Sequence, residues 1–532
     1  MSRLRDGVVA AVAVVTVVAL VSRVVGLGVR PYHWDEARVG FWALRYLETG
    51  VYQYRPVAGG PLLYTVTRQI LGFAGSSDLT GRLFVAALGG TAPLAALLFR
   101  SRLERQETVL LAVVLATAPP LVYYSRFLRG DVPVAVFTLV AFGATLSWLD
   151  WDQPRFLYLA AVSAACAFGS SGFAVATAGL IFVAAAITFD HRRVTGQPGD
   201  PVDALVKKTD RLRDHKRHLA GAGITFLGTW VALFAPRGGI IRTDGMSVLT
   251  AAFRDPVVAF VGVRILGRPA TEFIPAVSNA IPVLTVTAGP LVAVAALGFL
   301  ADRYAQADSH RPVVAFSAVW GGLGIIVYPL VAASLGPWVI VHVVTPLAIP
   351  AAAGLSKLVD YGRVAMARGD AARLAVAAMV LLSVGSHAGL TATAAYETGQ
   401  PGDPLVHSAQ PVDDLEGIVG EMETAVGDRQ DASARVVWVG SQVHTEANLR
   451  SPPLTSGAER AVFAQRLPLV YYLERAQVPT SSVSQAENLT GDPAVVISVP
   501  SEAGVVARQL PDHERRSVQV ASDRELVVFL PE

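Results

Sequence analysis

Two adjacent carboxylates, Asp35 and Glu36, follow the first long hydrophobic run of the chain, in the stretch PYHWDEARVGFW at residues 31–42. His33 precedes them and Arg38 follows them. Ionisable groups at a membrane boundary are costly unless they are solvated or paired, so a cluster of them needs a reason.

A second cluster, YYSRFLRGD at residues 123–131, lies in a very short loop between two further hydrophobic runs. The short loop fixes Arg126, Arg129 and Asp131 at the bilayer surface. If that surface is the outer one, positive residues there are unfavourable for topology, and an arginine pair is better explained by an anionic ligand. A lipid phosphate fits. A carboxylate from one loop and an arginine pair from another, both at headgroup level, indicate a reaction on a lipid-linked phosphate substrate.

Structural explanations of the same residues stand beside this one. Asp35 and Glu36 could start a helix, because acidic residues favour a first turn. Arg126 and Arg129 could anchor phospholipids, and Asp131 could cap the following helix. Taken alone, each cluster is better explained by a structural role. The appearance of both in one chain favours a functional role. His33 is expected to be a hydrogen-bonded interface residue rather than a metal ligand.

Composition places the chain among polytopic membrane proteins. Of 532 residues, 52% are hydrophobic and 16% are charged, where a soluble chain would carry about 25% charge. The mean hydropathy is +0.46. The net charge of +2 comes with basic residues in short loops rather than on one face, which excludes a nucleic-acid partner. The single cysteine, Cys166, cannot form an internal disulfide and is interpreted as packing.

A membrane span needs roughly 20 mostly apolar residues. On that basis the sequence predicts about eleven transmembrane helices in a domain over residues 1–395, at 8–29, 82–100, 108–124, 132–149, 156–168, 172–189, 219–235, 282–300, 312–333, 338–355 and 374–394. The first is read as an anchor rather than a cleaved signal. Residues 61–75 are apolar but short and carry Arg68, which predicts an amphipathic helix lying in the interface.

Charge orients this predicted bundle. The loop at 191–218 is the most basic, with HRR, KK, RLR and HKRH, and the positive-inside rule makes it cytoplasmic. The N-terminus is then cytoplasmic, and both charged clusters lie on the extracytoplasmic side of a cell membrane.

Residues 396–532 have a different composition, with shorter apolar runs and turn residues. Buried strands are expected at 435–440, 494–500 and 526–531, and helices at 411–426 and 468–476. This predicts a small α/β domain, which an odd number of spans places outside the cell. Asn488 begins an Asn-Leu-Thr sequon that would be accessible there. The sequence contains no phosphate-cradling glycine loop and no Cys/His cluster at metal spacing.

The order of these motifs resembles a known group. WDEA after the first helix, followed by a YSRFLRGD-type loop before the fourth, is similar to the polyprenyl-phosphate-sugar-dependent membrane glycosyltransferases of the GT-C fold. These include protein O-mannosyltransferases and lipid A aminoarabinose transferases. Closer still, WDEARVGFWALRYLETG, YYSRFLRGDVP, QPVDDL and RLPLVYYLERA resemble the archaeal flippase-activity-associated family linked to protein N-glycosylation. The resemblance covers essentially the whole chain.

The resemblance implies roles for named residues. Asp35 would be the catalytic or metal-contacting carboxylate, with Glu36 its neighbour and Asp131 the acidic residue of the second loop. Arg126 and Arg129 would hold the donor phosphate, and His33 and Tyr124 would join them in binding substrate. The cofactor is left open, with a divalent cation on Asp35 and Asp131 as the alternative to none. The implied reaction is an inverting displacement in which a carboxylate takes the proton of the acceptor hydroxyl.

Two functions are therefore carried forward. In the first, the protein transfers a sugar from a dolichyl (polyprenyl) phosphate donor to an acceptor on the outer face. In the second, it is a non-catalytic flippase component or receptor for the lipid-linked sugar, since fold does not fix function. The predicted partners are the lipid-linked sugar, the bilayer and other membrane proteins of a glycosylation pathway. The predicted spans contain almost no charged residues, which confines the chemistry to the outer surface and favours transfer.

Overall fold

The structure is a computed structural model of the chain. It describes all residues except 1, 55–58, 195–212, 239–244, 266–272, 305–310, 333–335, 394, 397–403, 408, 430–434 and 447–456. Most of the basic loop at 191–218 and much of the 400–404 linker therefore lie outside the described residues.

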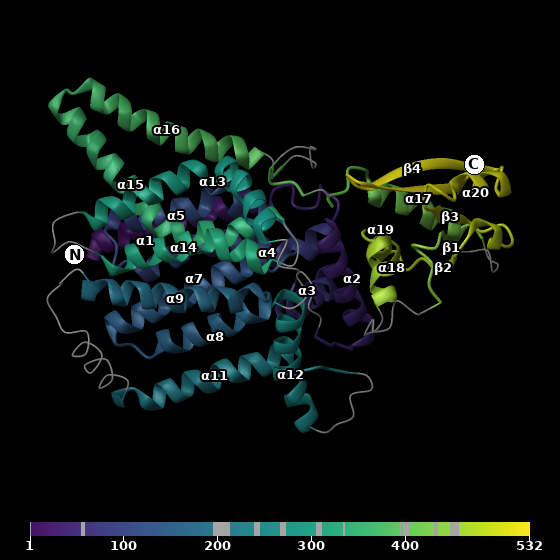
Figure 1. The fold of residues 1–532 in the computed structure, drawn as a ribbon, viewed down its shortest axis with the longest axis horizontal. Helices are drawn as coiled ribbons and strands as arrows, with labels where there is room; N and C mark the ends of the chain where they lie inside the picture. The colour runs from purple at the N-terminus through teal and green to yellow at the C-terminus, as the bar shows by residue number, and fades with distance from the viewer. Residues whose placement is uncertain are drawn as a thin grey trace.

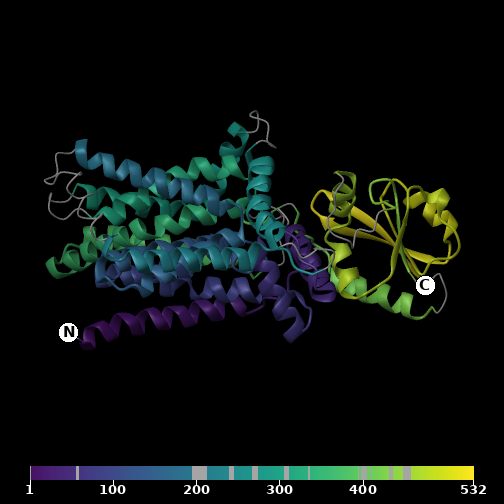
Figure 2. The same cartoon turned by 90° about the horizontal axis from the view of Figure 1, so that it is seen from below.

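The long helices of the membrane part form a roughly parallel bundle, and α12 runs across their direction (Figures 1 and 2). Its elements are α1 (Ser2–Val24), α2 (Trp34–Thr49), α3 (Pro61–Ala74), α4 (Asp78–Thr91), η1 (Ala92–Phe99), α5 (Arg105–Thr117), α6 (Pro119–Tyr124), α7 (Asp131–Trp151), α8 (Arg155–Ser170), α9 (Phe173–Val194), α11 (Lys216–Phe234), α12 (Gly245–Ala259), η2 (Phe260–Ile265), α13 (Phe273–Arg303), α14 (Pro312–Val331), η5 (Pro337–Val339), α15 (Ile340–Arg368) and α16 (Ala371–Thr393).

Every predicted span overlaps a helix or two successive helices, although the first one, 8–29, extends past the end of α1 at Val24. Among the described residues, seven helices are long and apolar enough to cross a membrane by themselves. The apolar helices Arg155–Ser170 and Phe173–Phe189 are shorter. The predicted span 108–124 breaks between α5 and α6, because Pro119 and Pro120 have no N–H to continue the helical ladder. The segment predicted as an amphipathic helix is helical as α3.

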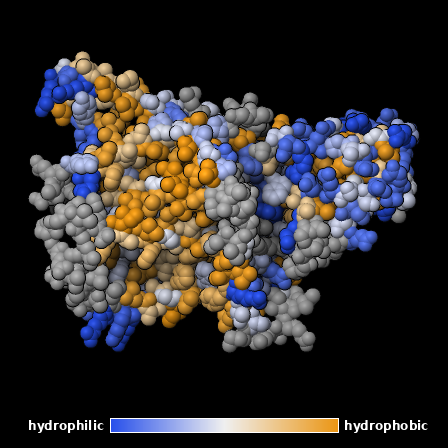
Figure 3. Space-filling view, viewed as in Figure 1, coloured by the Kyte–Doolittle hydropathy of each residue, from blue (hydrophilic) through white to orange (hydrophobic). Residues whose placement is uncertain are grey.

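The long helix α15 runs through the centre of the bundle, and its most apolar window is completely buried. It contacts α5, α7, α13, α14 and α16. The closest approach is to α13, where a Cβ added at Gly298 would lie 1.9 Å from the carbonyl oxygen of Pro350. On the face shown in Figure 3, hydrophobic side chains cover the middle of the bundle, whereas the C-terminal domain is mostly hydrophilic. This surface fits a protein embedded in a bilayer.

The C-terminal part folds around one five-stranded sheet with the order β2-β1-β3-β5-β4. Strands β1, β2 and β3 are parallel, and β5 pairs antiparallel with both β3 and β4. Its elements are α17 (Leu415–Gly427), β1 (Val436–Val439), α18 (Gly457–Arg466), α19 (Leu469–Arg475), β2 (Thr480–Val483), η6 (Ala486–Asn488), β3 (Val495–Ser498), α20 (Ala503–Gln509), β4 (His513–Ala521) and β5 (Arg524–Pro531).

The predicted strands and helices of this part are confirmed, and β2 and β4 are additional. Asn488 of the sequon is exposed, and its glycosylation stays a prediction. The domain boundary predicted between residues 395 and 396 falls just after α16 and also stays a prediction.

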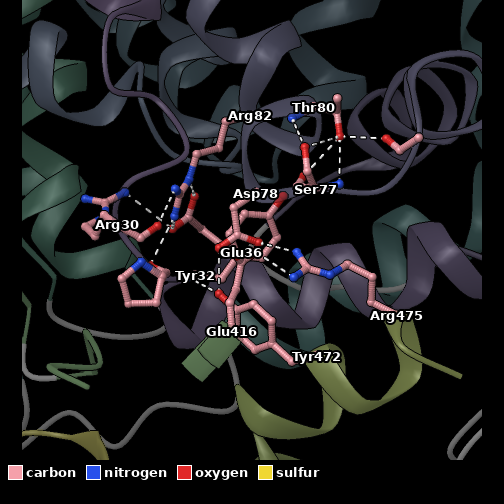
Figure 4. Close-up of polar contacts among 12 residues, drawn as sticks. Arg30, Tyr32, Glu36, Ser77, Asp78, Thr80, Arg82, Glu416, Tyr472 and Arg475 are labelled. Atoms are coloured by element: carbon pink, nitrogen blue, oxygen red, sulfur yellow. Dashed lines mark hydrogen bonds and ion pairs between the residues drawn. The ribbon is translucent and has the colours of Figure 1, made fainter. Parts of the chain in front are cut away.

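A set of contacts that we call the clasp fastens the C-terminal domain to the bundle (Figure 4). The hydroxyl of Tyr472 accepts the backbone N–H of Tyr32 at 2.7 Å and donates to the carboxylate of Asp78 at 2.6 Å. Arg475 pairs with the other oxygen of Asp78 at 2.8 Å. The ring of Tyr471 stacks on that of Tyr32, with centroids 4.8 Å apart. The clasp thus joins α19 to the start of α4 and to the residues before α2.

The orientation of the bundle can be tested on described, exposed residues. The N-terminus and the C-terminal domain lie at opposite ends of the bundle (Figure 1). We expect Ala372, in the first turn of α16, to be cytoplasmic and Ser501 to be extracytoplasmic, because the positive-inside rule places the basic loops inside. In a Cys166→Ala background, an impermeant thiol reagent added to intact cells should label Ser501→Cys but not Ala372→Cys. The reverse pattern would overturn the predicted orientation.

Candidate active site

Helix α2 begins at Trp34, directly before the two carboxylates, so the expectation of a helix start is confirmed. His33 is the N-cap. Its ring nitrogen Nδ1 accepts the backbone N–H of Asp35 at 3.1 Å, and the backbone N–H of His33 donates to the carboxylate of Glu36 at 2.9 Å. This reciprocal arrangement is a capping box, which satisfies two donors that a helix start otherwise leaves without partners. The carboxylates have further partners, which differ sharply between Asp35 and Glu36.

Glu36 is completely buried and joins three segments of the chain. Its two oxygens accept the guanidinium of Arg82, from α4, at 2.7 and 2.8 Å (Figure 4). The N–H of Leu128, in the second predicted loop, donates to the same carboxylate at 2.8 Å. Burial alone would raise the pKa of Glu36, but the charge of Arg82 outweighs it and lowers that pKa. Both oxygens are therefore occupied by protein donors, which is the geometry of a residue that positions others.

Asp35 points to a different partner, Arg129 of the second loop. One oxygen of Asp35 pairs with the Arg129 guanidinium, and the other accepts from Arg38 at 2.9 Å. Arg129 also donates from Nε to Asp131 at 3.0 Å, and the second oxygen of Asp131 lies 3.3 Å from Nε2 of His342. The two loops singled out in the sequence therefore meet, and Asp35, Arg129 and Asp131 form one cluster.

Arg126 does not join this cluster. Its guanidinium donates to the carbonyls of Val25 at 2.6 Å and Gly26 at 2.9 Å, and to two more at the end of α1. The guanidinium also lies 4.6 Å from the centre of the Tyr396 ring. Tyr124, predicted to bind substrate, instead donates its hydroxyl to the carbonyl of Leu405 at 2.6 Å. Their substrate-binding roles stay predictions.

Three members of the site have no counterpart in the sequence-based prediction. They are Trp338, His342 and His407. The Arg129 guanidinium lies 3.7 Å from the centre of the Trp338 ring, and the His407 ring centre lies 4.9 Å from the same ring. His342 had a usable signal, because an ionisable residue inside a predicted span at 338–355 indicates function. His407 had none, since it lies in a polar segment without a motif.

The donor set does not fit a metal ion. The described residues contain no group of three or more His, Cys, Asp or Glu side chains that could hold one. The guanidinium of Arg129 lies between the carboxylates of Asp35 and Asp131 and supplies the positive charge that a cation would bring.

The electrostatics of the cluster fix two charge states. Burial would raise the pKa of Asp35, but the charges of Arg129 and Arg38 outweigh it and hold that pKa below its ordinary value. Burial lowers the pKa of His33 to about 3. Near neutral pH, Asp35 is therefore an anion and His33 is neutral. An ion-paired carboxylate is a weak base, and its basicity rises when one of its arginines is drawn to another anion.

Comparison with solved structures identifies the fold. ArnT from Cupriavidus metallidurans bound to undecaprenyl phosphate superimposes with a TM-score of 0.60 and 15% identity, covering 97% of each chain. Its apo state gives a TM-score of 0.57. The Archaeoglobus fulgidus oligosaccharyltransferase in the apo form gives 0.51 at 13% identity, covering 95% of this chain and 69% of that one. The protein is thus a membrane protein of the GT-C fold.

Its last domain can be assigned more narrowly. Residues 415–531 match the family model of the Agl23 flippase-associated protein C-terminal domain. No curated protein matches the chain by sequence. The chain therefore combines a bundle of the GT-C fold with an Agl23-type C-terminal domain, as the motifs of the sequence led us to expect.

Proposed function

We propose that the protein is a membrane glycosyltransferase that moves a sugar from a dolichyl (polyprenyl) phosphate to an acceptor on the extracytoplasmic face, in a protein or cell-surface glycosylation pathway. The observation that carries this proposal is the meeting of Asp35, Arg129 and Asp131 from two separate loops. Buried charges are expensive, so a cluster of this kind at the end of a membrane bundle supports a functional role.

An apolar cavity supports a lipid-linked donor. It has a volume of about 530 Å³ and lies between α1, α5, α13 and α16, where Val18, Leu110, Leu291 and Leu381 line it. Tyr396 also lines the cavity, and the guanidinium of Arg126 lies over its ring. An isoprenoid chain matches such a lining, and a cation beside it suits a phosphate at the end of that chain.

The arginines suggest how donor binding could activate Asp35. Arg126 lies beside the cavity and Arg129 beside Asp35, on one short loop. A donor phosphate at this loop competes with Asp35 for the guanidinium of Arg129. Losing part of that ion pair raises the pKa of Asp35 and makes its carboxylate a better base.

The transfer itself is a single displacement. Asp35 takes the proton of the acceptor hydroxyl while the hydroxyl oxygen forms a bond to the anomeric carbon of the sugar. The bond from that carbon to the phosphate oxygen breaks at the same time. The polyprenyl phosphate leaves with the electron pair, and Arg129 stabilises its charge. General-base help of this kind contributes roughly 10²–10⁴ in rate.

One observation favours the second function. The family model that matches residues 415–531 is named for association with a flippase, so a part in lipid-sugar translocation is the alternative. Reconstitution of the purified protein in liposomes distinguishes the two functions. The liposomes contain dolichyl-phosphate mannose or dolichyl-phosphate glucose as the donor. Transfer to an added acceptor supports the proposal. Donor translocation without transfer would replace it by the second function.

The arginines should govern donor affinity. Arg126→Ala and Arg129→Ala should each weaken binding of dolichyl phosphate by roughly 1.5–3 kcal/mol, because each removes a charge-assisted contact. Lysine at position 129 should restore only part of the affinity, since it lacks the planar fork. Binding of fluorescent dolichyl phosphate to purified protein measures the effect.

A matched control is Arg102→Ala, which removes an arginine that pairs with Asp150. It should bind the lipid as the wild type does. Unchanged affinity in both alanine variants at normal folded yield would return the pair to a structural role.

A further inference from the structure

The segment between α16 and α17 crosses the candidate active site. We call its described residues 404–407 and 409–411 the strap. Leu405 is bound by Tyr124, and the N–H of Trp34 donates to the carbonyl of Ala409 at 3.3 Å. The side-chain amide of Gln410 donates to the carbonyl of Pro31 at 3.0 Å. The strap is thus attached on both sides of His407, to the loop that carries Arg129 and to the residues that precede Asp35.

His407 is the strap residue that meets the site. Its Nδ1 lies 3.3 Å from Nε2 of His33, and its ring packs against the ring of Trp338. The guanidinium of Arg129 lies over that same tryptophan ring. The charged or titratable groups that act on it are His33 and Asp35 from the start of α2, Arg129, and Asp523 from the turn between β4 and β5. Burial lowers the pKa of His407, so its imidazole is neutral near neutral pH.

The hydrogen bonds fix which ring nitrogen carries the proton. Nδ1 of His33 accepts the N–H of Asp35, so the single proton of this neutral ring is on Nε2. Nδ1 of His407 accepts the N–H of Ala409 at 3.2 Å and so carries no proton, which leaves the two donors, this N–H and the Nε2–H of His33, sharing its lone pair. One continuous chain of donors and acceptors runs from the backbone of Asp35 through His33 to His407.

We propose that His407 is a positioning residue that holds the proton of His33 on Nε2 and thereby fixes the first turn of α2, which carries Asp35. At many functional sites, the hydrogen bond made by one ring nitrogen of a histidine decides whether the other nitrogen carries the proton. The inference rests on the proposed function for its kinetic readout and not for its structural readout. It makes the linker to the C-terminal domain part of the site.

Two amide substitutions separate the nitrogens of His407. In His407→Asn the amide oxygen can take the position of Nδ1 and accept from His33, whereas in His407→Gln the amide reaches toward the position of Nε2. We expect His407→Ala and His407→Gln to lower kcat for sugar transfer about five- to tenfold, with KM for dolichyl-phosphate mannose changed less than about twofold. His407→Asn should retain most of the wild-type kcat. His444→Ala, at a half-buried histidine bonded to Ser482, is the matched control and should be neutral.

Hydrogen–deuterium exchange of the peptide covering residues 31–42 gives a readout that needs no activity. Exchange should rise about fivefold in His407→Ala and His407→Gln but stay near the wild-type rate in His407→Asn, because the N–H of Asp35 is bonded to His33. Wild-type protein without transfer but with this exchange pattern would refute the proposed function and keep the positioning role. Rescue by glutamine rather than asparagine, or a rise in KM alone, would show that His407 contacts the ligand directly. Wild-type exchange in all three variants would overturn the inference.

Discussion

Asp35→Asn is expected to bind the lipid donor with nearly wild-type affinity and to transfer its sugar at about one hundredth of the wild-type rate or less. The amide keeps the shape of the side chain but cannot take the proton of the acceptor hydroxyl. Arg129 keeps its second carboxylate partner, Asp131, so the cluster does not collapse. Transfer from labelled dolichyl-phosphate mannose, followed in liposomes beside lipid movement, measures both quantities on one preparation.

Glu48→Gln is the matched control, because Glu48 lies on the same helix as Asp35 and pairs with Arg45 in a partly exposed position. Its transfer rate should be that of the wild type. If Asp35 only starts a helix, its loss should cost about 0.3–1 kcal/mol of stability and spare turnover. Equal transfer rates in Asp35→Asn and the wild type would therefore end the catalytic interpretation of this carboxylate.

Breaking the pair between Glu36 and Arg82 should destabilise the protein rather than slow its chemistry. Both side chains are completely buried. Glu36→Gln leaves the charge of Arg82 without its carboxylate, and Arg82→Met leaves Glu36 with the longer ion pair to Arg30 at 3.4 Å, so we expect each to cost about 3–5 kcal/mol. Thermal unfolding of purified protein in detergent should show a large loss in each variant. Transfer per folded molecule should fall far less than in Asp35→Asn.

The double variant Glu36→Gln/Arg82→Met tests the cause. It removes both charges together and should be more stable than the sum of the two single losses implies. Arg102→Met, which breaks a more exposed pair with Asp150, should cost no more than about 1 kcal/mol. A small effect of Glu36→Gln on unfolding, together with a large loss of turnover, would instead make Glu36 a catalytic group.

The membrane helices were predictable because a bilayer demands long apolar segments, and composition alone shows them. Buried strands such as β1 and β3 were predictable for a related reason, since they read as short apolar runs. Strand β4 was not. Its sequence HERRSVQVA is largely polar, and it forms because it pairs along its whole length with β5 at the edge of the sheet.

The site was predictable in part for equally physical reasons. Asp35, Arg129 and Asp131 stood out as charges where charge is expensive. The sequence could not assign different partners to Asp35 and Glu36, because two neighbouring residues of a helix point in different directions and only the packed bundle supplies Arg82 to one and Arg129 to the other. The contact of His33 with His407 joins residues 374 positions apart, which no local pattern contains.

The clasp has a consequence for how the protein is made. The backbone N–H of Tyr32 donates to the hydroxyl of Tyr472, 440 residues later, so this contact forms only after the segment that carries Tyr472 has been synthesised. Contacts this distant in sequence form late, because the loop between them must close first. Until the C-terminal domain has folded, the residues before Asp35 lack these partners. Loss of the C-terminal domain should therefore leave the bundle without the contacts that fix the residues before Asp35.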